Sequence, residues 1–359
     1  MAQTLRPDLN ERPLSLRQKI GQMLLVGFNG AGVGDSSVRV RDILDYGVGG
    51  VVLFGQNVGW PQQVTELTTA LQTASYRVTG LRRSSSPRTR KAGAPAASTH
   101  NLAWNRTIPR KPSAHWTMSN APPPTPVTWP RASSRWASTS ILPPVVDLNT
   151  NPYNPVIGAL ARSFSADPAV VARQAGAFIH AHADEGLLCT LKHFPGHGSS
   201  RQDSHYGFVD VTQTWRDTEL DPYRTLIDTG DSDAIMTAHI FNANLDAQLP
   251  ATLSPTVITD LLRGDLGYGG LIFTDDLQMN AIRAYYTFEE AVRLAVLAGV
   301  DVLSISNTFL YQRDAVAIAV AVIEDMVTSG RITEARIETS FQRIVRAKTP
   351  LADLIFDPA

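Results

Sequence analysis

Residues 187–206 read LLCTLKHFPGHGSSRQDSHY, a short apolar run followed by a loop crowded with titratable side chains. The apolar run, 187–191, has the length and composition of a buried strand, and Gly186 before it is typical of a helix end. The loop contains Lys192, Asp203 and three histidines. Such side chains at the end of a rigid strand are where chemistry is usually placed, so we expect a functional site here.

The histidines of this loop allow three interpretations. His193 and His197, four residues apart, could ligate a metal ion with nearby polar side chains, although the proline and glycines around them exclude a helix, the usual support for such a pair. The loop could instead be a polar surface segment without a site. In the third interpretation, Asp203 orients the imidazole of His205, which acts as a general acid and base near neutral pH. Lys192 and His193 would then hydrogen-bond the substrate's hydroxyl groups.

A second stretch, residues 270–279 (GLIFTDDLQM), reads as a strand that ends in two adjacent carboxylates. KHFPGHG followed by DSH resembles the acid/base loop of the bacterial β-N-acetylglucosaminidases (β-hexosaminidases) of glycoside hydrolase family 3, and GLIFTDDLQM resembles that family's nucleophile strand. The resemblance implies a retaining glycosidase. In it, Asp275 would be the nucleophile, His205 the proton donor and acceptor, and Asp203 the partner that holds the imidazole. Asp276 should point the opposite way, because neighbouring strand residues alternate.

The resemblance also implies the substrate and, together with the positions of residues at expected strand ends, indicates the residues that bind it. The substrates would be glycoconjugates with terminal β-linked N-acetylglucosamine, notably peptidoglycan fragments that carry 1,6-anhydro-muramic acid. Whether water or phosphate accepts the sugar stays open. Arg162 follows the Ile-Gly pair at a slightly longer spacing than the family pattern. The substrate-binding residues that we expect are Lys192, His193, Arg162, His239 and Asp147.

The order of expected elements predicts the fold class. Apolar runs that read as strands alternate with helical segments and centre near residues 25, 52, 146, 189, 236, 272 and 303. This alternation is typical of a parallel β/α fold, and the gap between 52 and 146 has room for an eighth unit. We therefore expect an α/β protein with a (β/α)₈ TIM-like barrel, in which the expected site residues meet at the carboxyl ends of the strands. An open doubly wound sheet is the alternative, but no GxGxxG follows the first strand.

The composition changes abruptly in the third β/α unit. Residues 67–146 contain no Asp or Glu in eighty positions, but hold eleven of the 32 lysines and arginines and four of the six tryptophans. In the family, this region should contain a third strand that ends in an Asp-Gln-Glu-Gly-Gly-like motif, and that motif is absent. The resemblance covers residues 15–75 and 144–348. We expect one domain, residues 1–359, with the third unit disrupted or replaced by an anomalous segment at 77–140.

Three interpretations of residues 77–140 stay open: a disordered basic linker, an arm that binds nucleic acid through basic residues and tryptophans, or a segment read out of frame. We favour the last, because it accounts together for the lost motif, the altered composition and the clean return to family-like sequence. It predicts that this polypeptide binds substrate weakly or not at all. Two alternative functions stay open. One is a catalytically impaired product, and the other is a metal-dependent barrel hydrolase that uses His193, His197 and Asp275.

The overall composition limits partners and compartment. A net charge of −1 over 359 residues gives no general attraction to nucleic acid or anionic membranes. One cysteine, Cys189, excludes an internal disulfide framework and suits a reducing compartment. No signal-peptide pattern or membrane-length apolar run occurs. We expect a cytoplasmic monomer that needs no metal or cofactor, acts on a small glycan or muropeptide, and has no nucleic-acid or membrane partner.

Overall fold

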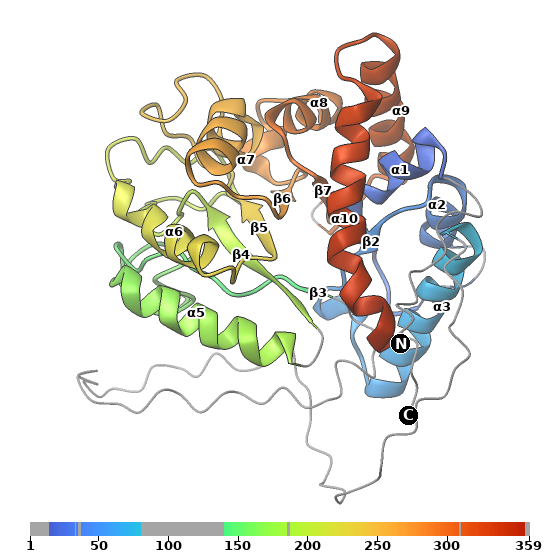
Figure 1. Cartoon of the computed structure of the whole chain (residues 1–359), viewed down its shortest axis with the longest axis horizontal. Helices are drawn as coiled ribbons and strands as arrows, with labels where there is room; N and C mark the ends of the chain where they lie inside the picture. The colour runs from blue at the N-terminus through green and yellow to red at the C-terminus, as the bar shows by residue number, and fades with distance from the viewer. Residues whose placement is uncertain are drawn as a thin grey trace, which may run out of the picture.

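The computed structural model describes residues 14–32, 34, 37–79, 140–184, 187–308 and 310–355, and these residues contain one parallel sheet surrounded by helices (Figure 1). The described strands are β1 (Leu24–Val26), β2 (Gly50–Val51), β3 (Ser140–Ile141), β4 (Leu188–Phe194), β5 (Ala234–Thr237), β6 (Leu271–Asp276) and β7 (Val302–Ile305).

The described helices precede, separate and follow these strands in the chain. The α-helices are α1 (Leu16–Gln22), α2 (Val38–Tyr46), α3 (Pro61–Thr79), α5 (Pro168–Ala183), α6 (Asp221–Asp228), α7 (Asn280–Arg283), α8 (Phe288–Ala298), α9 (Ala315–Thr328) and α10 (Glu334–Ile355). Shorter or irregular turns form η1 (Gly55–Asn57), η2 (Asp217–Leu220), η3 (Ala251–Leu253) and the π-helix η4 (Thr256–Asp265). Within the part of the chain that the structure describes, no helix combines the length and apolar character that a membrane crossing requires.

The strand order shows a barrel with one interruption in its described part. The order is β2-β1-β7-β6-β5-β4-β3, and every pairing is parallel. The first strand pairs with the last, Leu24 opposite Leu303, as closure of a ring requires. A doubly wound sheet instead reverses its order at an internal switch point. The TIM-like α/β fold is therefore confirmed. The interruption falls between β2 and β3, and the anomalous segment 77–140 lies outside the described residues except for 77–79 and 140.

The ends of several helices follow from local sequence. Ser15 accepts a hydrogen bond from the backbone N–H of Gln18, whose side chain accepts from the N–H of Ser15, so a capping box opens α1. A second capping box at Thr287 opens α8. Gly47 ends α2 with φ +68°, a left-handed conformation that favours glycine.

The strand expected near residue 146 differs from the structure. The regular strand β3 is Ser140–Ile141, and Val145 forms only an isolated bridge with Lys192. Pro143 and Pro144 explain the interruption: their carbonyls accept hydrogen bonds from the N–H groups of Thr190 and Lys192, but proline has no N–H to donate in return.

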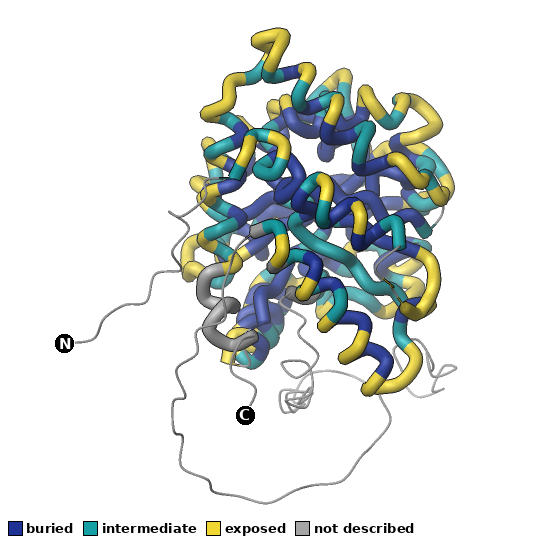
Figure 2. Tube along the Cα trace, turned by 90° about the vertical axis from the view of Figure 1, so that its right-hand side faces the viewer, coloured by how far each residue is buried: buried dark blue, intermediate teal, exposed yellow. Residues whose placement is uncertain are grey.

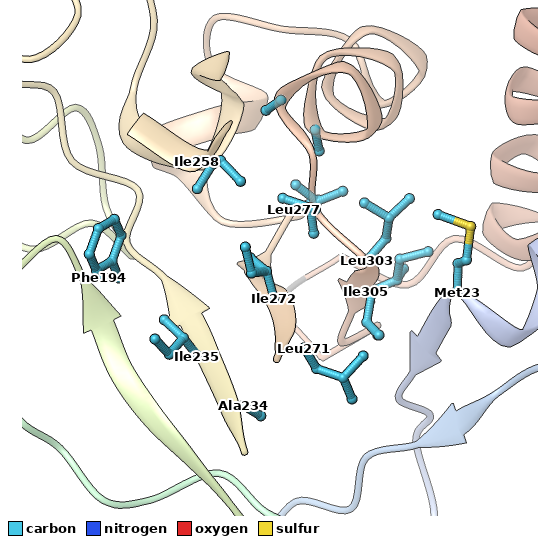
Figure 3. Close-up of a cluster of buried hydrophobic side chains, with 14 of the residues drawn as sticks. Met23, Phe194, Ala234, Ile235, Ile258, Leu271, Ile272, Leu277, Leu303 and Ile305 are labelled. Atoms are coloured by element: carbon cyan, nitrogen blue, oxygen red, sulfur yellow. The ribbon is translucent and has the colours of Figure 1, made fainter. Parts of the chain in front are cut away.

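The core fills the space between the strands and their covering helices. Apolar side chains from several strands converge there, including Phe194 of β4, Ile235 of β5 and Ile272 of β6 (Figure 3). Every residue of β5 is buried, as expected for a parallel strand covered on both faces. In Figure 2, the buried stretches lie inside and the exposed turns outside. This rigid core fixes the strand ends that carry the site.

Candidate active site

A cavity of about 170 Å³ lies among the barrel strands and the segments that follow them. Five of the eight expected site residues line it: Asp275, His205, Lys192, His193 and Arg162. The other lining residues are Leu25, Val52, Phe54, Leu142, Val156, Ile157, His197, Ser204, Met236, Asp276, Met279, Ser304, Ser306 and Thr308. Strand β6 and the loop after β4 therefore share one cavity, as the proposed chemistry requires.

Asp275 lies near the end of β6 and accepts the backbone N–H of Asp276 at 2.8 Å. Burial opposes ionisation of its carboxyl group, but electrostatic interactions with His239, His193 and Lys192 outweigh burial, so the pKa of Asp275 lies below its ordinary value. The side chain is thus held as a carboxylate, the form in which it can attack an electrophilic carbon.

Asp276 is held by the neighbouring strand. Its Oδ1 accepts the backbone N–H groups of Ser306 and Gln278 at 3.0 and 3.1 Å, and its Oδ2 accepts the Ser306 hydroxyl. Burial raises the pKa of this carboxyl group. Although Asp276 borders the cavity, its oxygens connect β6 to the segment after β7, consistent with a structural role beside Asp275.

Asp203 and His205 form the expected pair. Oδ1 of Asp203 lies 2.6 Å from Nδ1 of His205 and also accepts the backbone N–H of His205 at 2.8 Å. A carboxylate can only accept, so the hydrogen lies on Nδ1, and Nε2 is the ring nitrogen that can exchange a proton with a substrate. The His205 side chain is 36% exposed, which leaves it accessible from the cavity. A bond from the Ala281 N–H to the Ser204 carbonyl, 3.2 Å, ties this loop to α7.

Asp147 orients the histidines rather than lining the cavity. Its Oδ2 lies 2.7 Å from Nδ1 of His193, and its Oδ1 accepts the backbone N–H groups of His193 and His197 at 3.1 and 2.8 Å. Burial alone would raise the pKa of Asp147, but the two histidines lower it below its ordinary value. We expected Asp147 to contact the substrate directly. The structure instead places its side chain in a buried contact that positions His193.

His197 holds the loop together through serine hydroxyls. Its Nδ1 lies 2.9 Å from Oγ of Ser200, and its Nε2 lies 3.3 Å from Oγ of Ser204. Burial lowers the pKa of His197 to about 4, so its ring is neutral near pH 7. Among the residues that the structure describes, no group of three His, Cys, Asp or Glu side chains is arranged to hold a metal ion. The structure therefore gives no support to the metal-ligand interpretation of this loop.

The two remaining expected residues differ in position. Arg162 lines the cavity, and its Nη1 donates to the Val156 carbonyl at 2.9 Å. His239 is buried, and both ring nitrogens have partners: Nε2 donates to the Asp276 carbonyl at 2.8 Å, and Nδ1 lies 2.9 Å from Oγ1 of Thr252. His239 thus supports the backbone at the end of β6 instead of reaching the cavity, where we expected it to bind substrate.

Sequence reasoning missed the support beneath the loop. Glu219 is 1% exposed, and its Oε2 accepts the backbone N–H of Gly198 at 3.1 Å. Burial raises the pKa of Glu219 to about 7. Trp215 donates from Nε1 to the Pro195 carbonyl at 3.1 Å. Glu219 lies in η2, and Trp215 lies just before it. In the sequence they appear as an acidic residue and a tryptophan ahead of an amphipathic helix, a pattern that does not indicate their contacts with the loop.

Gly198→Ala is expected to destabilise the fold by about 2–3 kcal/mol, because overpacking forces the backbone to move. A Cβ at Gly198 would lie 1.8 Å from the carbonyl oxygen of Leu148, the residue after Asp147. The matched control is Gly207→Ala in the same loop, where a Cβ meets no atom within 4 Å. Urea unfolding of both variants checks this, and equal stabilities would contradict the close approach.

Comparison with known proteins places these features in one family. The model of the glycosyl hydrolase family 3 N-terminal domain matches residues 136–347. Beta-hexosaminidase A from Pseudoalteromonas piscicida is 29% identical over 94% of this chain and 62% of its own length. A beta-hexosaminidase from Stenotrophomonas maltophilia (strain K279a) is 33% identical over 79% of this chain and 83% of its own length.

A solved structure agrees with the fold. The family 3 beta-N-acetylglucosaminidase from Paenibacillus sp. str. FPU-7 superposes with a TM-score of 0.75 at 30% identity, covering 96% of this chain and 64% of that one. This chain thus spans less than two thirds of the Pseudoalteromonas and Paenibacillus proteins.

Proposed function

Because this chain belongs to glycosyl hydrolase family 3, we propose that it releases terminal β-linked N-acetylglucosamine from glycoconjugates, with peptidoglycan fragments as substrates and with retention of configuration. Relatives named beta-hexosaminidase and beta-N-acetylglucosaminidase support the sugar. One observation carries the chemistry: Asp275 and His205, which Asp203 holds, line the same cavity.

In the first step, an oxygen of Asp275 attacks C1 of the sugar while the C1–O bond to the leaving group breaks. His205 gives its proton to the leaving oxygen, and a glycosyl-enzyme forms. In the second step, His205 takes a proton from water as the water oxygen attacks C1, and the Asp275 carboxylate leaves. Asp203 keeps the ring oriented and stabilises its charged form. The lowered pKa of Asp275 suits both steps, because the carboxylate must attack and later depart.

Lys192 and Arg162 would bind the sugar's hydroxyl groups, and His193 would do so in the orientation that Asp147 gives it. Burial lowers the pKa of Lys192 to about 8, with the nearby carboxylate of Asp275 partly offsetting burial. Lys192 is therefore an ammonium group near neutral pH, with three donors for sugar hydroxyls.

Sugar affinity is expected to fall as pH rises through about 8, where Lys192 loses its proton. The ammonium form predominates below this pKa, so the loss lies on the alkaline side. A charged hydrogen bond contributes roughly 1.5–3 kcal/mol, so a fall of about ten- to hundredfold is expected. Lys192→Arg stays charged in this range and should lack this alkaline loss. Calorimetric titration of the wild-type protein and of Lys192→Arg with N-acetylglucosamine across the alkaline range checks both expectations. The same loss of affinity in both proteins would show that a group other than Lys192 titrates.

The activity of this chain is expected to be lower than that of an intact relative. The Asp-Gln-Glu-Gly-Gly-like motif belongs to the third β/α unit, and residues 80–139, where that unit would lie, do not contain it. A sugar-binding carboxylate and part of the barrel wall would be lost with the motif. Binding should therefore be weak even though Asp275, His205 and Lys192 are in place.

The test is to incubate the purified chain with p-nitrophenyl β-N-acetylglucosaminide and to follow the first-formed anomer by NMR, with and without phosphate and a metal chelator. We expect the β-anomer of free N-acetylglucosamine as the first product. It should form at a rate below that of an intact relative, and the chelator should not change this rate. The α-anomer, or loss of activity with chelator, would contradict the mechanism. A sugar 1-phosphate would show that phosphate, rather than water, is the acceptor.

A further inference from the structure

Exposed large apolar side chains are unevenly distributed over the molecule. Among the described residues, ten such side chains are exposed, and nine lie in segments that lead from a strand to the following main helix. The exception is Leu297 in α8. These segments form the catalytic face of a barrel. Exposed apolar groups that gather on one face indicate a binding surface rather than incomplete burial.

One aromatic ring on this face, that of Phe208, contacts two others beside the acid/base loop. The ring of Phe208 lies 5.3 Å from that of Phe241 and 5.4 Å from that of Tyr285, measured between centroids. Phe208 is 38% exposed and Tyr285 is 61% exposed. The three rings come from the segments after β4, β5 and β6, and we call them the aromatic platform.

The backbone under the platform is fixed by hydrogen bonds. The N–H of Phe241 donates to the Val209 carbonyl at 2.8 Å, and its carbonyl accepts the N–H of Val211 at 2.9 Å. On the other side, the bond between Ala281 and Ser204 ties α7, which precedes Tyr285, to the loop that carries His205. Rings held in this way lose little freedom when a ligand stacks on them.

We propose that the aromatic platform is a subsite for the leaving-group sugar, the second pyranose ring of the substrate. This rests on the proposed function, in which His205 protonates the oxygen between the two sugars. The leaving sugar must therefore lie on the His205 side of the cavity, and Phe208 is only three residues further along that loop. A pyranose has a face of C–H groups that packs on a flat aromatic ring, so the rings of the platform, rather than a polar group on them, would bind the sugar.

The test compares two substrates that share the cleaved sugar but differ in leaving group: N,N′,N″-triacetylchitotriose, which leaves as a disaccharide, and β-N-acetylglucosaminyl fluoride, which leaves as an ion. The measured quantity is the ratio of kcat/KM for the trisaccharide to that for the fluoride. Loss of one ring contact should lower this ratio about three- to tenfold in Tyr285→Ala. Tyr285→Phe, which keeps the ring, and Leu297→Ala, outside the catalytic face, should keep the wild-type ratio.

An unchanged ratio in Tyr285→Ala, or an equal fall in Leu297→Ala, would overturn the subsite. If no protein cleaves either substrate, the proposed function fails, and binding decides the subsite separately. Calorimetric titration of triacetylchitotriose into Asp275→Asn should then give a Kd that rises about three- to tenfold when Tyr285→Ala is added. A Kd that does not depend on Tyr285, or no binding by either protein, would overturn the subsite as well.

Discussion

Replacing Asp275 by alanine is expected to lower kcat/KM roughly 10⁴-fold or more, because loss of a nucleophile removes the covalent route. The carboxylate borders the cavity, and surrounding positive charge keeps the pKa of Asp275 low. Its contact with the backbone N–H of Asp276 is local, so the fold should survive. Steady-state kinetics on p-nitrophenyl β-N-acetylglucosaminide, with circular dichroism as the check on folding, measures the loss.

Rescue of Asp275→Ala by azide tests the nucleophile more specifically. In Asp275→Ala, the small anion can take the place of the missing carboxylate, attack C1 from the same side, and displace the leaving group. Part of the turnover should return, with the α-glycosyl azide as product. Asp275→Ala with near wild-type activity, or a β-azide, would mean that another group attacks the sugar.

His205→Ala is expected to lower kcat/KM by about 10²–10⁴-fold for a substrate with a poor leaving group, such as diacetylchitobiose, since this is the usual contribution of a general acid. With 2,4-dinitrophenol as leaving group, departure needs no proton, and the first step should be far less affected. The dependence of rate on leaving-group acidity should therefore be steeper in the variant. The measurement is a series of aryl glycosides assayed with both proteins.

Asp203→Asn is the companion variant for this prediction. An amide can still contact Nδ1 of His205 across the 2.6 Å contact, but it no longer stabilises the charged ring. We expect a smaller loss than in His205→Ala, with the same dependence on leaving group. If both variants lost activity equally for good and poor leaving groups, His205 would not be the proton donor.

Much of the fold and site could be predicted from local pattern. Alternating apolar runs predicted the barrel, and the resemblance of two stretches to family 3 motifs implied that Asp275 and His205 would share a cavity. The closure of β1 on β7 was implied only by the count of units. The shift of β3 followed from Pro143 and Pro144, whose lack of donors was visible in the sequence but was not weighed.

The roles of Asp147 and His239 could not be predicted, because they depend on contacts distant in sequence. Asp147 bonds to a histidine 46 residues away, and the partner of His239 at the end of β6 is 37 residues away. Both lie at the end of an expected strand, and pattern shows that position but not the direction of the side chain. Glu219 was missed for the same reason, since its contact with Gly198 depends on how η2 lies under the loop.

The central claim is that Asp275 becomes covalently bonded to the sugar within the cavity that His205 shares. The most direct measurement is to incubate the protein with a 5-fluoro-N-acetylglucosaminyl fluoride, whose ring fluorine slows breakdown of the glycosyl-enzyme, and to locate the adduct by peptide mass spectrometry. We predict one added sugar on the peptide that contains Asp275, and none in Asp275→Ala. An adduct on a different residue, or one that persists in Asp275→Ala, would contradict the account.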